Sequence, residues 1–318
     1  MTALSDASLR RLASVANLPD LSGTRYTLRE EIGRGGMAVV YRAHDETLGR
    51  AVAIKVSSAP GGRTDLDARM RTEAKVLALL EHPGVVPVHD AGVLPDGRAF
   101  YVMKHVRGTL LGDLARSQLA ADERVRILER MCETMAFAHA HGIVHRDLKP
   151  DNVMIGGFGE VLVMDWGVAR IPGEPGEAGA VIGTPGYMAP EQAAGRSGDA
   201  DQRADVYALG AILFALLVGA DPPAEPEAVQ AALAARRDLP RRLRAVAGKA
   251  LATDPAARYS DAEEMGADLA RFRAGRPVAA RPETWVERSA RSAWAYRTAI
   301  GLVLAYLAMR VVVAWLAG

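Results

Sequence analysis

The sequence predicts an α+β protein with two lobes and an apolar C-terminal helix. Short β-type runs broken by glycines fill residues 26–105 around one helical pattern, which indicates a five-stranded antiparallel sheet with one helix. Long helical patterns dominate residues 108–275, so the second lobe is expected to be mainly helical. From residue 298 to the end the chain is apolar except for Arg310.

The elements of the first lobe, residues 25–107, follow from the hydrophobic pattern. A polar lead-in over residues 1–24 comes before them and has neither the basic start nor the apolar run of a secretory signal. The expected helix covers residues 63–80, because Met70, Ala74, Leu77 and Leu80 recur at helical spacing. The expected strands cover residues 26–32, 38–44, 50–56, 84–91 and 98–105.

The second lobe, residues 108–275, combines long helical patterns with brief β-type runs. The clearest helices are expected over residues 121–141 and 204–219, and the β-type runs over residues 153–155 and 161–164. Residues 276–296 are rich in arginine and interrupted by prolines, which is typical of a linker.

Charge and cysteine content exclude several classes of protein. Lysine and arginine number 39 and aspartate and glutamate 38, so the net charge favours no nucleic-acid partner. Cys132 is the one cysteine, so the sequence predicts neither an internal disulfide nor a zinc site, as is usual in a reducing compartment.

A glycine-rich run lies between the first two expected strands. It reads Ile32-Gly33-Arg34-Gly35-Gly36-Met37-Ala38-Val39-Val40. Because glycine has no Cβ, backbone N–H groups in such a hairpin can approach phosphate oxygens and cover a nucleotide. The run is not a Rossmann motif, since a strand follows it rather than a helix. Taken alone, it is equally compatible with an ordinary turn.

A lysine and a glutamate are placed to form an ion pair across this lobe. Lys55 lies on the third expected strand, and Glu73 lies in the expected helix. A lysine can hold the α and β phosphate oxygens of a nucleotide if a carboxylate fixes its ammonium group. Considered singly, both side chains are more simply solvated surface residues. The glycine-rich run beside them favours the paired arrangement.

The most specific motif is the run from His145 to Asn152, which reads HRDLKPDN. Transfer of a phosphoryl group to a hydroxyl needs a carboxylate near the acceptor proton, a cation for the moving charge and an oxygen ligand for magnesium. Asp147, Lys149 and Asn152 supply these groups. Magnesium prefers oxygen ligands, so Asp165 in Asp165-Trp166-Gly167 is the expected second ligand.

Together with Ala189-Pro190-Glu191, these motifs resemble the protein-kinase signature over residues 26–275. Details such as Asp205-Val206-Tyr207 resemble the bacterial branch of the eukaryotic-type, or Hanks-type, Ser/Thr kinases. Lys149 and the run Gly183–Tyr187 resemble the Ser/Thr rather than the tyrosine subclass. The resemblance implies a bilobal protein-kinase fold that transfers the γ-phosphate of ATP, with Mg²⁺ or Mn²⁺, to protein substrates.

The resemblance also implies roles for individual residues. The expected catalytic residues are Asp147 as base, Lys149 beside the transferred group, and Lys55 oriented by Glu73; the expected metal ligands are Asn152 and Asp165. The expected ATP-binding residues are Ile32, Gly33, Arg34, Gly35, Gly36, Val40, Ala53, Lys55, Met103 as gatekeeper, Lys104, Val106 and Met154. The expected structural and regulatory residues are Arg146, Thr184, Glu191 paired with Arg258, and Asp205 bracing the catalytic loop.

Some positions depart from the family pattern. Ala38 replaces the third glycine of the glycine-rich run Ile32–Val40, which we call the flap. In Asp165-Trp166-Gly167, Trp166 replaces the usual phenylalanine. Lys104 and Arg107 replace acidic residues near the hinge, which makes Asp113 the candidate for a ribose contact.

The activation segment also departs from the pattern, because residues 168–183 contain no serine, threonine or tyrosine. One hypothesis is that Glu174 or Glu177 takes the place of a phosphate opposite Arg146 and makes the enzyme constitutively competent. The alternative, that both glutamates are solvated loop residues, is equally compatible with the sequence.

Residues 297–318 are predicted to form a transmembrane helix that anchors the chain in the cell membrane by residues 298–317. A helix of this length can cross a hydrocarbon core of about 30 Å. Arg310 opposes insertion by about 3 kcal/mol, which leaves the sum marginally favourable. Arginines before the run, in the expected juxtamembrane linker, place the catalytic domain in the cytoplasm. A packed or dimerising soluble helix, and hence a homodimer, is the alternative.

Two other functions are compatible with the same fold. A pseudokinase that binds nucleotide as a scaffold normally lacks a phosphate lysine, base or metal ligand, whereas Lys55, Asp147, Asn152 and Asp165 are all present. A small-molecule phosphotransferase of the same fold is disfavoured because residues 183–191 resemble a peptide-docking segment.

Overall fold

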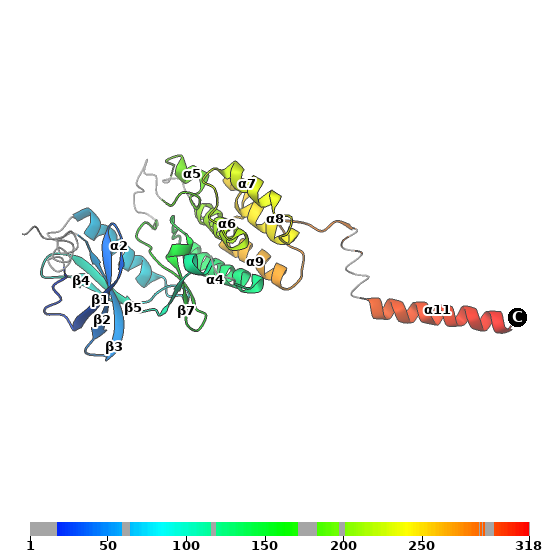
Figure 1. Cartoon of the computed structure of the whole chain (residues 1–318), viewed down its shortest axis with the longest axis horizontal. Helices are drawn as coiled ribbons and strands as arrows, with labels where there is room; N and C mark the ends of the chain where they lie inside the picture. The colour runs from blue at the N-terminus through cyan, green and yellow to red at the C-terminus, as the bar shows by residue number, and fades with distance from the viewer. Residues whose placement is uncertain are drawn as a thin grey trace, which may run out of the picture.

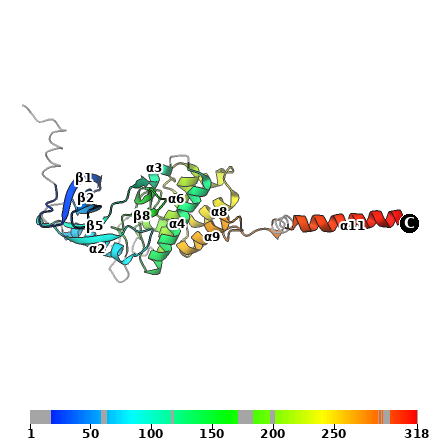
Figure 2. The ribbon, with the colours of Figure 1, turned by 90° about the horizontal axis from the view of Figure 1, so that it is seen from below.

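The computed structural model describes residues 18–58, 64–115, 119–170, 183–196, 201–285, 287, 289 and 296–317. A smaller lobe built on a sheet lies beside a larger helical lobe, and helix α11 extends beyond the larger lobe (Figures 1 and 2). Glu174 and Glu177 lie outside the described residues, so the hypothesis about these glutamates stays a prediction.

The N-terminal lobe is a five-stranded antiparallel sheet with one helix, which confirms the prediction for this part of the fold. The strand order is β1-β2-β3-β5-β4, and the register of each pair is antiparallel. The elements are β1 (Tyr26–Arg34), β2 (Ala38–Asp45), β3 (Arg50–Ser57), α2 (Thr64–Leu79), β4 (Val88–Val93) and β5 (Ala99–Lys104).

One strand begins later than the pattern predicts. The run from Gly84 to Ala91 was expected to be continuous, but β4 begins at Val88. The start of the run pairs instead with the C-terminal lobe: Val85 forms a parallel bridge with Val163, whose N–H donates to the Gly84 carbonyl at 2.8 Å. These backbone contacts connect the segment after α2 to β8 of the C-terminal lobe.

The two faces of the sheet contact different hydrophobic clusters. Tyr41, Ile54 and Val102 belong to a cluster within the N-terminal lobe. Tyr101, by contrast, joins the large cluster that contains Leu77 of α2 and continues through the C-terminal lobe. Because burial of apolar surface drives this packing, one hydrophobic cluster holds the two lobes together.

The C-terminal lobe is mainly helical, with a small three-stranded sheet ordered β6-β7-β8. Helix α6 is its centre, since nearly all its residues are buried; Asp201 caps its start and Gly219, with φ of 80°, ends it. The elements are β6 (Gly108–Leu110), α3 (Leu111–Ala115), α4 (Ala121–Ala140), η1 (Pro150–Asn152), β7 (Val153–Gly156), β8 (Val161–Val163), α5 (Pro190–Ala193), α6 (Gln202–Val218), α7 (Pro226–Ala235), α8 (Arg241–Ala250), η2 (Pro255–Ala257) and α9 (Ala262–Arg273).

The packed domain extends past Gly275, where the sequence pattern placed its end. Val278 is buried, and the Ala279 and Ala280 N–H groups donate to the carboxylate of Asp268 at 2.6 and 2.9 Å. The prolines here interrupt a helix without preventing packing, so the start of the expected linker belongs to the lobe.

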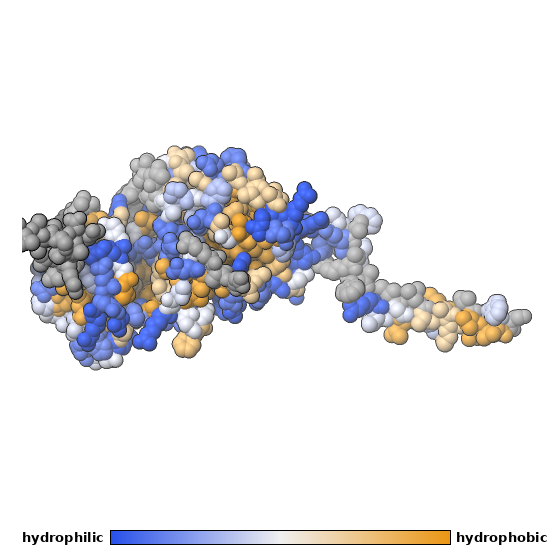
Figure 3. Space-filling view, viewed as in Figure 1, coloured by the Kyte–Doolittle hydropathy of each residue, from blue (hydrophilic) through white to orange (hydrophobic). Residues whose placement is uncertain are grey.

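The C-terminal segment forms helix α11 (Arg297–Ala317). Apolar side chains such as Leu302 and Trp315 are exposed along it (Figure 3). In the part of the chain that the structure describes, no helix has both the length and the apolar character needed to cross a membrane. The predicted span is therefore not supported in the described residues.

Candidate active site

A cleft of about 770 Å³ lies between the lobes. Its lining includes residues of the flap between β1 and β2, of the segment after β5 and of the catalytic loop, residues 145–152. The expected ATP-binding residues all line this cleft: Ile32, Gly33, Arg34, Gly35, Gly36, Val40, Ala53, Lys55, Met103, Lys104, Val106 and Met154. Asp151 also lines the cleft, whereas Asp113, expected near a ribose, lies on α3 and is not among the lining residues.

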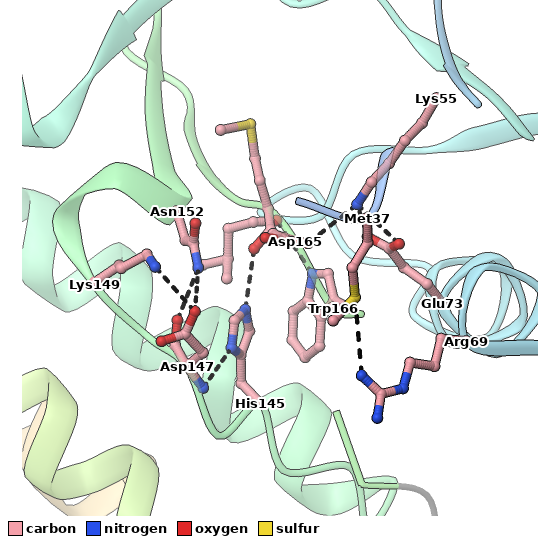
Figure 4. Close-up of polar contacts among 12 residues, drawn as sticks. Met37, Lys55, Arg69, Glu73, His145, Asp147, Lys149, Asn152, Asp165 and Trp166 are labelled. Carbon is pink, nitrogen blue, oxygen red and sulfur yellow. Dashed lines mark hydrogen bonds and ion pairs between the residues drawn. The ribbon is translucent and has the colours of Figure 1, made fainter. Parts of the chain in front are cut away.

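The flap is a closed hairpin whose tip contacts α2. The Gly35 N–H donates to the Ala38 carbonyl at 2.9 Å, which closes the turn. Met37 lies at this tip, and Nη1 of Arg69 donates to its Sδ at 3.9 Å (Figure 4). The flap is thereby joined to the helix that also carries Glu73.

Lys55 points from the centre of the sheet into the cleft. It lies on β3, opposite Val40 of β2 and Tyr101 of β5. Its Nζ donates to both carboxylate oxygens of Glu73, at 2.7 and 2.9 Å, and to Asp165 Oδ1 at 3.1 Å (Figure 4). Burial lowers the pKa of Lys55, but Tyr101, Glu73 and Asp165 outweigh it and raise the pKa above its ordinary value. The ammonium group is therefore charged throughout the neutral range.

Asp165 lies beside the ion pair of Lys55 and Glu73 and has an unusual backbone conformation. Its φ is 59°, in the left-handed region that few residues other than glycine adopt. Burial raises the pKa of Asp165, but the charge and hydrogen bond of Lys55 lower it below the ordinary value. Its carboxylate is ionised at neutral pH and 54% exposed to the cleft.

Trp166 anchors the segment that carries Asp165. Its side chain is fully buried, its Nε1 donates to the Val163 carbonyl at 3.3 Å, and its ring lies 4.6 Å from that of His145. The larger aromatic residue is thus accommodated in the core, with a hydrogen bond that phenylalanine cannot make.

Asp147, Lys149 and Thr184 form a compact triangle of hydrogen bonds. The Thr184 hydroxyl donates to Asp147 Oδ1 at 2.8 Å, and Lys149 Nζ donates to the same hydroxyl at 2.9 Å. Lys149 also lies 3.1 Å from Asp147 Oδ2. Asn152 Nδ2 donates to the Asp147 carbonyl at 2.8 Å, which leaves the Asn152 amide oxygen available as a ligand (Figure 4). The site therefore holds a carboxylate, a cation and a hydroxyl within hydrogen-bonding distance.

Asp205 holds the catalytic loop from α6. One carboxylate oxygen accepts from the His145 N–H at 2.9 Å, and the other accepts from the Arg146 N–H at 2.9 Å. His139 Nε2 lies 2.9 Å from the same carboxylate. Burial raises the pKa of Asp205, but hydrogen bonds and charge from His139 and His145 lower it below its ordinary value. His139 was not singled out from the sequence, because nothing in the local pattern links α4 to α6.

Glu191 and Arg258 form a bidentate ion pair deep in the C-terminal lobe. The two guanidinium nitrogens donate to the two carboxylate oxygens at 2.7 and 2.8 Å. The remaining Arg258 donors reach the carbonyls of Ala252, Arg203 and Thr253. Every N–H direction of the guanidinium is thus used, and the pair fixes the start of α5.

Comparisons with known proteins agree with this geometry. A family model described as the protein kinase domain matches residues 26–268. The chain is 40% identical over 293 residues to the serine/threonine-protein kinase PknB of Mycolicibacterium smegmatis, covering 85% of this chain and 47% of that protein. It is 38% identical over 283 residues to a probable serine/threonine-protein kinase of Streptomyces coelicolor, covering 82% and 42%. The chain spans less than half the length of these relatives.

Proposed function

This chain belongs to the protein kinase family, in its bacterial Hanks-type Ser/Thr branch, and from that premise we propose that it transfers the γ-phosphate of ATP to serine and threonine hydroxyls of protein substrates. The observation that carries the proposal is the convergence of three side chains on one cleft, with a fourth beside them. Lys55, Asp147 and Asp165 line the cleft, and the Asn152 side chain donates a hydrogen bond to the Asp147 carbonyl.

In the proposed reaction, Lys55 holds the nucleotide phosphates and Asp147 receives the proton of the acceptor hydroxyl. The Thr184 hydroxyl supports this assignment, because it already donates to Asp147 while accepting from Lys149. An acceptor hydroxyl at a neighbouring position would meet the same carboxylate and the same cation. Lys149 would then stabilise the negative charge that develops on the transferred group.

The donor set fits magnesium. Among the described residues, no group of three or more histidine, cysteine, aspartate and glutamate side chains is placed to hold a metal ion alone. Asn152 and Asp165 instead offer two hard oxygen donors, which is typical of an ion that binds with a nucleotide and keeps other ligands from phosphate and water. When bound, the ion neutralises charge on the phosphate oxygens.

The other sequence-based predictions receive less support. A scaffold without catalysis is not favoured, because the phosphate lysine, the base and the metal ligands are all present. Nothing in the described structure supports a homodimer or attachment to a membrane, and the cytoplasmic position of the catalytic domain stays a prediction.

Transfer of radiolabelled phosphate to a generic acceptor protein tests the proposal. Wild type should label the acceptor on serine and threonine, while Asp147→Asn and Lys55→Met should each lose at least about 100-fold in rate. Glu123→Gln, a change at a half-exposed residue of α4, serves as the matched control. Labelling that survives both site substitutions would contradict the assigned roles, and labelling on tyrosine would contradict the acceptor class.

A further inference from the structure

Building on the proposed phosphoryl transfer, we infer that Gln192 positions the catalytic base by holding the peptide group between Arg146 and Asp147. Gln192 lies on α5 and is 1% exposed. Its Nε2 donates to the Arg146 carbonyl at 3.0 Å, and its Oε1 accepts from the Ala189 N–H at 3.2 Å. One side chain thus joins the start of α5 to the residue directly before Asp147.

The peptide that Gln192 contacts needs support, because Arg146 is in the left-handed region with φ of 67°. A residue with a Cβ adopts this conformation at a cost of about 1 kcal/mol or more. The Asp205 carboxylate accepts from the N–H groups of His145 and Arg146. Gln192 donates to the Arg146 carbonyl. The backbone is thus hydrogen-bonded before and after the strained residue.

The geometry connects this carbonyl directly to the proposed base. The Arg146 carbonyl and the Asp147 N–H belong to the same planar peptide group, so rotation of one rotates the other. On the other side of that group, the Asp147 N–H donates to His145 Nδ1 at 3.3 Å. Loss of the Gln192 contact would free the peptide to rotate and would displace the carboxylate from the acceptor hydroxyl.

A neutral amide of this length satisfies both neighbours. The site presents a donor, the Ala189 N–H, and an acceptor, the Arg146 carbonyl, to the same buried side chain. An ionised carboxylate could still accept from Ala189 but would face the Arg146 carbonyl without a proton. Because α5 is also fixed by Glu191 and Arg258, Gln192 couples a rigid element, beside the segment that holds Thr184, to the catalytic loop.

Steady-state kinetics of full-length Gln192→Glu and Gln192→Met test the inference, with ATP and the generic acceptor protein. Loss of the hydrogen bond should lower kcat about tenfold in both variants while KM for ATP stays within about twofold. The introduced carboxyl regains a proton as the pH falls and can then donate to the Arg146 carbonyl. The deficit of Gln192→Glu should therefore shrink toward pH 6, whereas that of Gln192→Met should not.

Gln202→Glu is the matched control, because Gln202 is a partly exposed glutamine that donates to the Ser260 carbonyl at 2.9 Å, away from the cleft. It should leave kcat unchanged. Should Gln192→Glu unfold below the assay temperature, Gln192→Met, of similar volume and uncharged, carries the test. Unchanged kcat in a folded Gln192 variant, or a change confined to KM, would overturn the inference. Failure of wild type to label the acceptor would instead overturn the proposed function.

Discussion

Replacing Glu191 with glutamine removes one charge from a buried ion pair in the C-terminal lobe. The Arg258 side chain has no exposed surface, and that of Glu191 is 13% exposed. Breaking a buried pair on one side leaves the partner charge uncompensated, which costs about 3–5 kcal/mol. The glutamine amide oxygen still accepts one of the two hydrogen bonds, so we expect a loss near the lower limit, about 3 kcal/mol. For a domain of this size, that loss corresponds to a fall in melting temperature of about 6–12 °C.

Urea denaturation followed by tryptophan fluorescence measures this loss as a change in the free energy of unfolding. Glu123→Gln is the matched control, since Glu123 pairs with Arg126 on the surface of α4 with both side chains at least 35% exposed. An exposed pair of this kind contributes about 0.5 kcal/mol or less. If Glu191→Gln lost less than about 1 kcal/mol, or no more than the control, the ion pair would not hold α5 in the way that its geometry indicates.

Two further predictions concern the supports of the catalytic loop. Because the pKa of Asp205 is lowered in the folded state, its carboxylate adds stability above the unfolded pKa of about 3.9, and this stability is lost as the pH falls through the folded pKa. The difference in unfolding free energy between wild type and Asp205→Asn should thus be largest near neutral pH and shrink below about pH 4; a constant difference across acid titration would contradict it. Trp166→Phe removes the hydrogen bond to Val163 and part of a buried ring, so thermal denaturation should report a loss of about 1–3 kcal/mol. An unchanged or higher melting temperature would show that the indole is not an anchor.

The fold was predictable where the pattern is local. The strands of the first lobe are short β-type runs of six to nine residues between turns, and α2 repeats its apolar positions at helical spacing. Prediction failed where a segment pairs across the chain. Gly84 and Val85 belong to a β-type run but bond to Val163, and β6, at three residues, is too short to give a pattern.

The site was predictable as a set of residues but not as a set of contacts. Lys55, Asp147 and Asp165 are recognisable because each lies in a short run of defined composition. Asp113 stays a predicted ribose contact, but it is Asp151 that is among the residues lining the cleft. Both are acidic residues on the same lobe, and the packing of α3 against η1 decides where each carboxylate lies.

By itself, the sequence determined the residue types that the chemistry needs and their order along the chain, because each motif is built from neighbours linked by a few covalent bonds. Only the tertiary structure decided which distant groups meet. Gln192 lies 46 residues along the chain from Arg146, whose carbonyl it contacts. His139 lies 66 residues from Asp205. Such contacts depend on how whole helices pack around the buried α6, and burial of apolar surface, which drives that packing, has no direction of its own. The hydrogen bonds that select one arrangement form only when both partners have been brought together.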